Sequence, residues 1–131
     1  MSESAVTSAT EGHPKDAVFR IPYQEIQDVA SEPGRKDDAG KPQCSLVLHG
    51  FARALLAVSE VATQPVESGK YSADNWRKVP DGIRRYTDAM QRHHLREAFE
   101  NLDPEDGMRH AAKTAWNALA RLELMLIGDA E

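Results

Sequence analysis

The feature that most constrains the fold is an apolar stripe near the C-terminal end of the sequence. Its members recur at intervals of three or four residues and would share one face of an α-helix: Met108, Ala111, Ala115, Leu119, Leu122 and Leu126. The stripe stops at Gly128. At its other end Asp103 can cap a helix whose first turn accepts Pro104. We therefore predict a long helix that begins at Asp103.

Two earlier stretches show the same helical period. One runs from Ser45, a possible cap, to Ala62, and the other runs from Asp81 to about Glu100. Between them, residues 63–80 contain two prolines and a glycine, which predicts a long loop. No segment alternates as a strand would. The predicted fold class is all-α, a small helical bundle.

Length and charge set the domain organisation. The chain has 131 residues, enough for one compact domain. Its net charge of -5 lies mostly in residues 1–40, which we predict to be a flexible N-terminal arm before a helical nucleotide-binding domain at 41–131. Phe19, Ile21 and Tyr23 could instead dock this arm on a neighbouring subunit.

The same composition excludes several protein classes. An acidic chain is a poor general binder of duplex nucleic acid. The single cysteine, Cys44, cannot form an intrachain disulfide or a four-cysteine zinc site. No apolar run is long enough for a membrane span and the start does not resemble a signal peptide, so we expect a cytoplasmic location. Three helices of this size would leave apolar faces uncovered, which favours a homo-oligomer.

The sequence between residues 77 and 117 offers candidate chemistry. His93 and His110 flank the turn between the last two predicted helices, so an antiparallel hairpin would bring them close, either as catalysts or as packing histidines. The acids near this turn could hold a hard cation such as Mg²⁺, or could simply cap a helix start. These acids are Glu97, Glu100, Asp103, Glu105 and Asp106.

A basic window, residues 77–96, could attract phosphate or could be an ordinary solvated helix face. Lys41, Lys70 and Arg92 are the candidate phosphate ligands. Tyr71 and Trp76 offer flat surfaces for a purine, or packing anchors at an interface. Asn117 lies in an apolar run and needs a polar partner, such as a base, a histidine or a loop carbonyl.

An ordered set of short motifs resembles a known family. The motifs are Asp38-Ala39-Gly40-Lys41-Pro42, Lys70-Tyr71-Ser72, Asn75-Trp76, Arg85-Tyr86, Asp88-Ala89, Arg92-His93, Asp103-Pro104-Glu105, Gly107, His110 and Ala115-Trp116-Asn117-Ala118-Leu119-Ala120. Together they cover roughly residues 36 to 126 and resemble phage-borne dATP/dGTP diphosphohydrolases, which are similar to the helical MazG-like pyrophosphohydrolases.

This resemblance implies Mg²⁺-dependent hydrolysis of purine deoxynucleoside triphosphates to monophosphate and pyrophosphate by an oligomeric enzyme. On this hypothesis three acids hold the metal, and one of two histidines orients or deprotonates the attacking water. The metal ligands would be Glu100, Asp103 and Glu105, and the histidines His93 and His110. The nucleotide would be bound by Lys41, Lys70, Tyr71, Asn75, Trp76, Arg92 and Asn117.

Two alternatives stay open at this point. MazG-like enzymes carry acidic pairs on two helices, whereas here the pairs Glu97-x-x-Glu100 and Glu100-x-x-Asp103 overlap in one stretch. This favours, as one alternative, a non-catalytic protein that sequesters a host signalling nucleotide. The other is a structural helical oligomer whose acids only cap helices.

Overall fold

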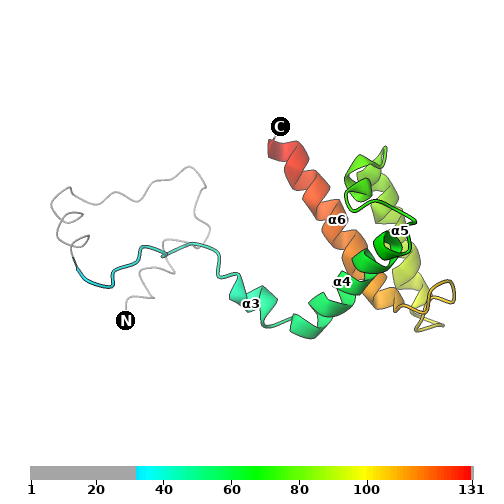
Figure 1. The fold of residues 1–131 in the computed structure, drawn as a ribbon, viewed down its shortest axis with the longest axis horizontal. Coiled ribbons are helices and arrows are strands. Elements are labelled where there is room, and N and C mark those ends of the chain that lie inside the picture. Colours follow the sequence, from blue (N-terminus) through cyan, green and yellow to red (C-terminus); the bar gives the residue numbers. More distant parts are fainter. Residues whose placement is uncertain (1–31, 131) are drawn as a thin grey trace. The chain divides into compact units, whose positions relative to one another are not determined.

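The computed structural model describes residues 32–130 and shows an all-α fold in them, which confirms the predicted fold class (Figure 1). The elements in chain order are α3 (Ser45–Leu48), α4 (Ala52–Glu67), the 3₁₀ turn η1 (Asn75–Lys78), α5 (Gly82–Arg96) and α6 (His110–Ala130). Within the described residues no strand forms, and the one isolated β-bridge pairs Leu102 with Arg109. None of these helices is long and apolar enough to cross a membrane.

The chain divides into two units, Met1–Cys44 and Ser45–Glu131. In the first unit the described part forms turns, held by a backbone hydrogen bond from the Lys41 amide to the Asp38 carbonyl and by an Arg35–Asp37 ion pair of 2.6 Å. Most of the predicted arm lies outside the described residues, as do the apolar side chains at positions 19, 21 and 23.

The prediction of a single helix over 45–62 is wrong, because α3 and α4 are separate helices. Gly50 lies at the break, where a Cβ would come within 2.5 Å of the Leu46 carbonyl oxygen. The helix also runs past the predicted end. Pro65 is accommodated in the last turn of α4, and Gly69 with φ +81° ends it in the left-handed conformation typical of a helix C-terminus.

The predicted start of the last helix is also wrong, since α6 begins at His110 rather than Asp103. Residues 103–108 form a closed turn in which the Gly107 amide donates to the Asp103 carbonyl at 2.7 Å. Gly107 has φ +77°, which interrupts any helix that begins earlier. α5 likewise ends at Arg96, before the predicted Glu100.

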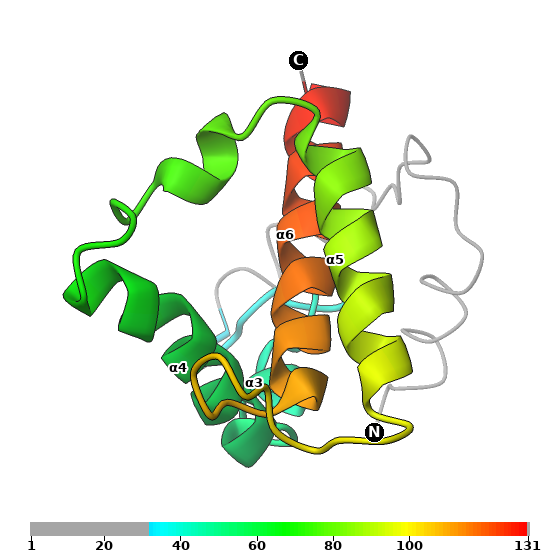
Figure 2. The same ribbon diagram turned by 90° about the vertical axis from the view of Figure 1, so that its right-hand side faces the viewer.

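Helices α5 and α6 lie side by side and antiparallel, and they form the body of the second unit (Figure 2). Gly82 permits the close approach at one end, since a Cβ there would lie 2.8 Å from Cδ1 of Leu124. Further along, the rings of Tyr86 and Trp116 meet edge to face at 5.6 Å. The packing therefore fixes α5 against α6 along the length that carries the candidate site.

The apolar core of this unit is small. Among the described residues only Ala112 and Ala120 are buried apolar side chains. Leu119, Leu122 and Leu126, which belong to the predicted stripe, are about half exposed, at 48%, 50% and 54%. Much of the α6 stripe thus faces away from the packed interior of a single chain.

Candidate functional site

A cleft of about 850 Å³ opens between α4, residues 70–80, α5 and α6. Its lining includes Lys70, Tyr71, Asn75, Trp76, Arg92, His93, Glu105 and Asn117, eight of the residues predicted from the sequence. Lys41 belongs to the first unit, whereas all the lining residues belong to the second. Glu100, Asp103 and His110 do not line the cleft.

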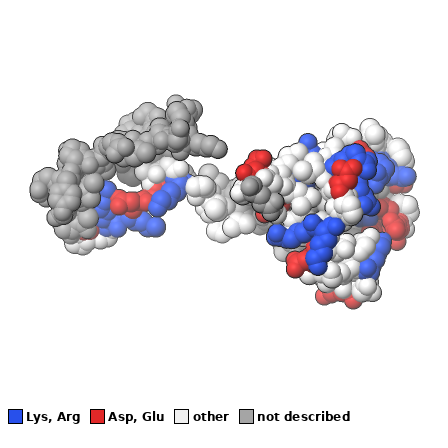
Figure 3. All heavy atoms as spheres, turned by 90° about the horizontal axis from the view of Figure 1, so that it is seen from above, with Lys and Arg blue, Asp and Glu red and all other residues white. Residues whose placement is uncertain are grey.

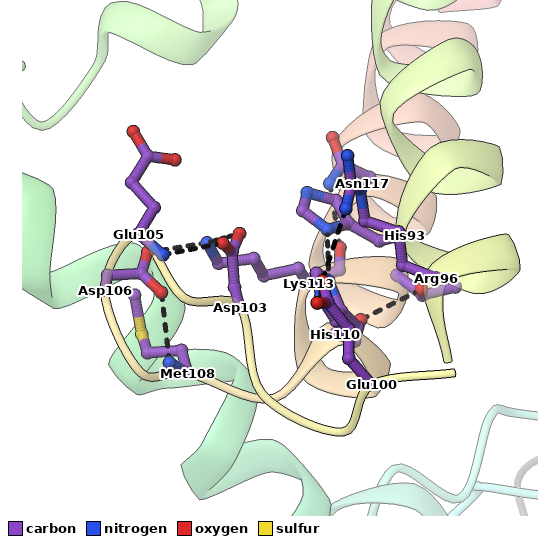
Figure 4. Close-up of polar contacts among 11 residues, drawn as sticks. His93, Arg96, Glu100, Asp103, Glu105, Asp106, Met108, His110, Lys113 and Asn117 are labelled. Carbon is purple, nitrogen blue, oxygen red and sulfur yellow. Dashed lines mark hydrogen bonds and ion pairs between the residues drawn. The ribbon is translucent and has the colours of Figure 1, made fainter. Parts of the chain in front are cut away.

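At the end of the α5–α6 hairpin three side chains form a chain of hydrogen bonds, which we call the histidine relay: Glu100, His110 and His93 (Figure 4). The Nδ1 atoms of the two histidines are 2.9 Å apart, and His110 Nε2 is 2.7 Å from Glu100 Oε2. Arg96 holds the same carboxylate oxygen at 3.3 Å. The prediction that the hairpin brings both histidines together is confirmed.

The hydrogen-bond pattern assigns the tautomers of the relay. A carboxylate only accepts, so His110 Nε2 carries the proton that it donates to Glu100. When His110 is neutral, its Nδ1 accepts and His93 donates to it from its own Nδ1. In that arrangement the Nε2 atom of His93 has a free lone pair, which is what a general base requires.

The two histidines differ in exposure. His110 is fully buried, at 0% exposed, whereas His93 is partly exposed and lines the cleft. Burial lowers the pKa of His93, and the nearby positive charge of Lys113 and the ring of His110 lower it further. Of the two histidines, His93 is therefore the one that lines the cleft and whose pKa is lowered.

Sequence reasoning missed Lys113. Its ammonium lies 2.7 Å from Asp103 Oδ2 and 2.6 Å from Asp106 Oδ2, and the residue is only 8% exposed. Burial by itself would lower the Lys113 pKa, but the hydrogen bonds from the two carboxylates outweigh it and the pKa is raised. The same ammonium lowers the pKa of Asp103. A lysine in the mostly apolar run 111–116, about one turn after His110, was the available signal.

The acids of the turn also satisfy its own backbone. Asp103 Oδ1 accepts from the Glu105 amide, and Asp106 Oδ1 accepts from the Met108 amide, both at 3.0 Å. These residues therefore cap turn amides rather than the start of α6. This local capping explains why a sequence that resembles a helix N-terminus closes into a turn.

The three acids predicted to bind Mg²⁺ have separate surroundings. Glu100 is bonded to His110 and Arg96, Asp103 to Lys113, and the side chain of the exposed Glu105 points away from both (Figure 4). As arranged they do not fit one ion as a ligand set. Ligand-type atoms do converge within 4.8 Å at His93, Asp103 and His110.

The opposite wall of the cleft carries aromatic and basic groups. The Lys70 ammonium lies 5.3 Å from the centre of the Tyr71 ring. The Arg77 guanidinium, which does not itself line the cleft, lies 4.9 Å from the centre of the Trp76 ring. The Tyr86 hydroxyl donates to the Trp76 carbonyl at 2.8 Å and so ties η1 to α5. This wall presents flat rings beside positive charge.

Two predicted polar roles are modified by the geometry. Asn117 donates to the Lys113 carbonyl one turn earlier in α6, at 2.8 Å, rather than to His110.

In the basic window, residues 77–96, Arg84 forms ion pairs with Asp81 at 2.5 Å and with Asp88 at 3.2 Å. Lys and Arg are accordingly interspersed with Asp and Glu on the face drawn in Figure 3. Arg92 keeps a place in the cleft lining.

A comparison with known families now identifies this arrangement. The model of the family described as dATP/dGTP diphosphohydrolase, N-terminal, matches residues 31–131. The chain belongs to this family. The match includes every helix from α3 to α6, and with them the cleft, the histidine relay and Lys113 of this dATP/dGTP diphosphohydrolase family member. No curated protein and no solved structure matches the chain.

Proposed function

We propose that the chain hydrolyses purine (deoxy)nucleoside triphosphates to monophosphate and pyrophosphate in the described cleft. The observation that carries this proposal is the histidine relay, in which a buried His110 is fixed by Glu100 and fixes His93 at the cleft wall. A carboxylate that orients one imidazole, which in turn orients a second, leaves His93 ready to accept a proton.

In the proposed reaction His93 Nε2 takes one proton from a water molecule. The water oxygen forms a bond to the α-phosphorus, the phosphoanhydride bond between the α- and β-phosphoryl groups breaks, and pyrophosphate leaves. Glu100 stabilises positive charge that develops in the relay, through its 2.7 Å hydrogen bond with His110. His110 is a positioning residue, because a fully buried ring cannot touch the substrate.

The cleft supports a nucleotide as the ligand. Its volume of about 850 Å³ falls within the range typical of small-molecule sites. Tyr71 and Trp76 would flank the purine, while Lys70 and Arg92 would bind the phosphates. Asn75 and Asn117 would supply polar contacts to the base or sugar.

Mg²⁺ is part of this proposal as a component of the substrate, the Mg²⁺ complex of the triphosphate. Phosphate oxygens supply ligands that the three separated acids do not supply together. A phage origin and action in the host cytoplasm, both implied by the resemblance, belong to the proposal as well.

A second function is favoured by one specific observation. Lys113 occupies the acidic pair Asp103 and Asp106, which a metal-dependent hydrolase would be expected to keep available. A chain of this kind could bind a nucleotide and sequester it without turnover. The two functions share the cleft and differ only in chemistry.

The deciding experiment incubates the purified protein with dATP, dGTP, ATP or GTP and Mg²⁺, with EDTA in parallel, and separates the products by chromatography. Monophosphate and pyrophosphate formed over many turnovers, and lost in EDTA, support the hydrolase. Denaturing the protein and recovering intact nucleotide in stoichiometric amount would instead support sequestration. A protein that neither hydrolyses nor retains any of the four nucleotides contradicts both.

We also propose that the protein is a homo-oligomer. The support is the half-exposed stripe of α6 together with the exposed apolar side chains of the region 46–56. Leu46, Phe51 and Leu56 are 68%, 59% and 68% exposed. Light scattering at micromolar concentration should give at least a dimeric mass, and a monomeric mass would contradict this.

A further inference from the structure

The position of Lys113 has a consequence for metal binding that the family does not assign. Its side chain extends from α6 into the turn 103–108 and ends between two carboxylates (Figure 4). Both distances, 2.7 Å and 2.6 Å, are those of short charge-assisted hydrogen bonds. The side chains of Asp103 and Asp106 are only 13% and 14% exposed, so the contact is largely shielded from solvent.

Two converging carboxylates are the ligand type that hard divalent cations prefer. Asp103 also belongs to the group in which ligand-type atoms of His93 and His110 lie within 4.8 Å. The turn therefore has carboxylate oxygens and imidazole nitrogens close together. The cation that lies between the two carboxylates is the ammonium group of Lys113.

We propose that Lys113 is a tethered cation that takes the place of a divalent metal ion between Asp103 and Asp106. A metal ion could bind there only by displacing the ammonium from both partners. Displacement of the ammonium is costly, because Lys113 is only 8% exposed and its side chain is therefore packed against the protein. Its backbone is also fixed in the first turn of α6. The acid pair is closed to metal in the wild-type chain and opens when Lys113 is removed.

This inference bears on the proposed function at one point only. It requires that any Mg²⁺ used in hydrolysis arrive with the triphosphate rather than reside at this acid pair. Metal binding is measured without nucleotide, so an inactive protein would leave the inference intact, and a resident metal would overturn it without touching the hydrolase proposal.

The test is a calorimetric titration of nucleotide-free protein with Mn²⁺, repeated with Mg²⁺. Lys113→Ala should bind one Mn²⁺ at least about tenfold more tightly than wild type. Lys78→Ala is the matched control, because it removes the same charge from an exposed lysine of the same cleft, and it should bind Mn²⁺ as wild type does. Adding Asp106→Asn to Lys113→Ala should abolish the gained site.

Two measurements keep the inference falsifiable if Lys113→Ala does not fold. Lys113→Met retains most of the packed stem and should show the same gain, with folding checked by far-UV circular dichroism. In the wild-type chain, Asp106→Asn should leave Mn²⁺ binding unchanged. A saturable wild-type site that Asp106→Asn removes, or a folded Lys113 variant with wild-type affinity, overturns the proposal.

Discussion

The two walls of the cleft are held in different ways. At the α5–α6 end, His110, Lys113 and Asn117 are all buried, and all have hydrogen-bond partners in α5, in α6 or in the segment that joins them. Along residues 70–80 the side chains are more open; Tyr71 is 48% exposed, and η1 is tied to α5 by one hydrogen bond from Tyr86. Fixed polar groups suit proton transfer, whereas an open aromatic wall suits binding that adapts to a ligand.

The largest expected effect tests the fixed wall. His93→Ala should lower kcat by about 10²- to 10⁴-fold, because it removes the proposed general base, while nucleotide affinity changes little. The control is His94→Ala, which removes the neighbouring histidine, whose side chain is 73% exposed. Steady-state kinetics and equilibrium binding together give both quantities. Equal turnover in the two variants would show that the relay has no catalytic role.

The next effect concerns the stability of the same wall. Lys113→Met should lower the free energy of unfolding by about 3 kcal/mol, because two shielded carboxylates lose their counter-charge. Arg84 also pairs with two acids, but these ion pairs are exposed to solvent. Arg84→Met should therefore leave the free energy of unfolding nearly unchanged. Urea denaturation followed by circular dichroism measures both. Equal losses in the free energy of unfolding would show that burial does not make the Lys113 ion pairs more stabilising than the exposed pairs of Arg84.

A smaller effect is expected on nucleotide binding. Arg92→Ala should weaken binding of dATP or dGTP by about 1.5 to 3 kcal/mol, roughly 10- to 150-fold, because a charge-assisted bond to phosphate is lost. Arg53→Ala removes an exposed arginine of α4 that does not line the cleft, and it should bind as wild type does. Isothermal titration provides the affinities. Unchanged affinity in the Arg92 variant would remove this residue from the nucleotide site.

The smallest effect is a shift in pH dependence. Protonated His93 cannot accept a proton, and burial lowers its pKa, so the acid limb of kcat/KM should have its midpoint below about 6.5. Because Lys113 also lowers this pKa, Lys113→Met should move the midpoint upward. Neutral His93 contributes stability that is fully present above about pH 6.5 and is lost as pH falls through its folded-state pKa. A midpoint that does not move in the Lys113 variant would contradict this coupling.

Part of the candidate site could be predicted from the chain alone. A short turn between two helical stripes implies an antiparallel hairpin, and residues that flank such a turn must lie near each other, as His93 and His110 do at 2.9 Å. The aromatic and basic residues of the loop 70–76 were likewise predicted as one group and line one cleft. Which partner each polar group takes was not predictable, because several acids lie within reach of each histidine and lysine.

The sequence by itself determined the all-α class, since the spacing of apolar residues reports helical period directly. Tertiary structure decided where α6 begins and what Lys113 does. Asp103 has the chemistry of a helix cap, but Gly107 in the left-handed region turns the chain and directs the carboxylates of Asp103 and Asp106 toward the Lys113 ammonium. A lysine and two acids separated by seven and ten residues show no period, so only folding reveals that they form one buried ion cluster.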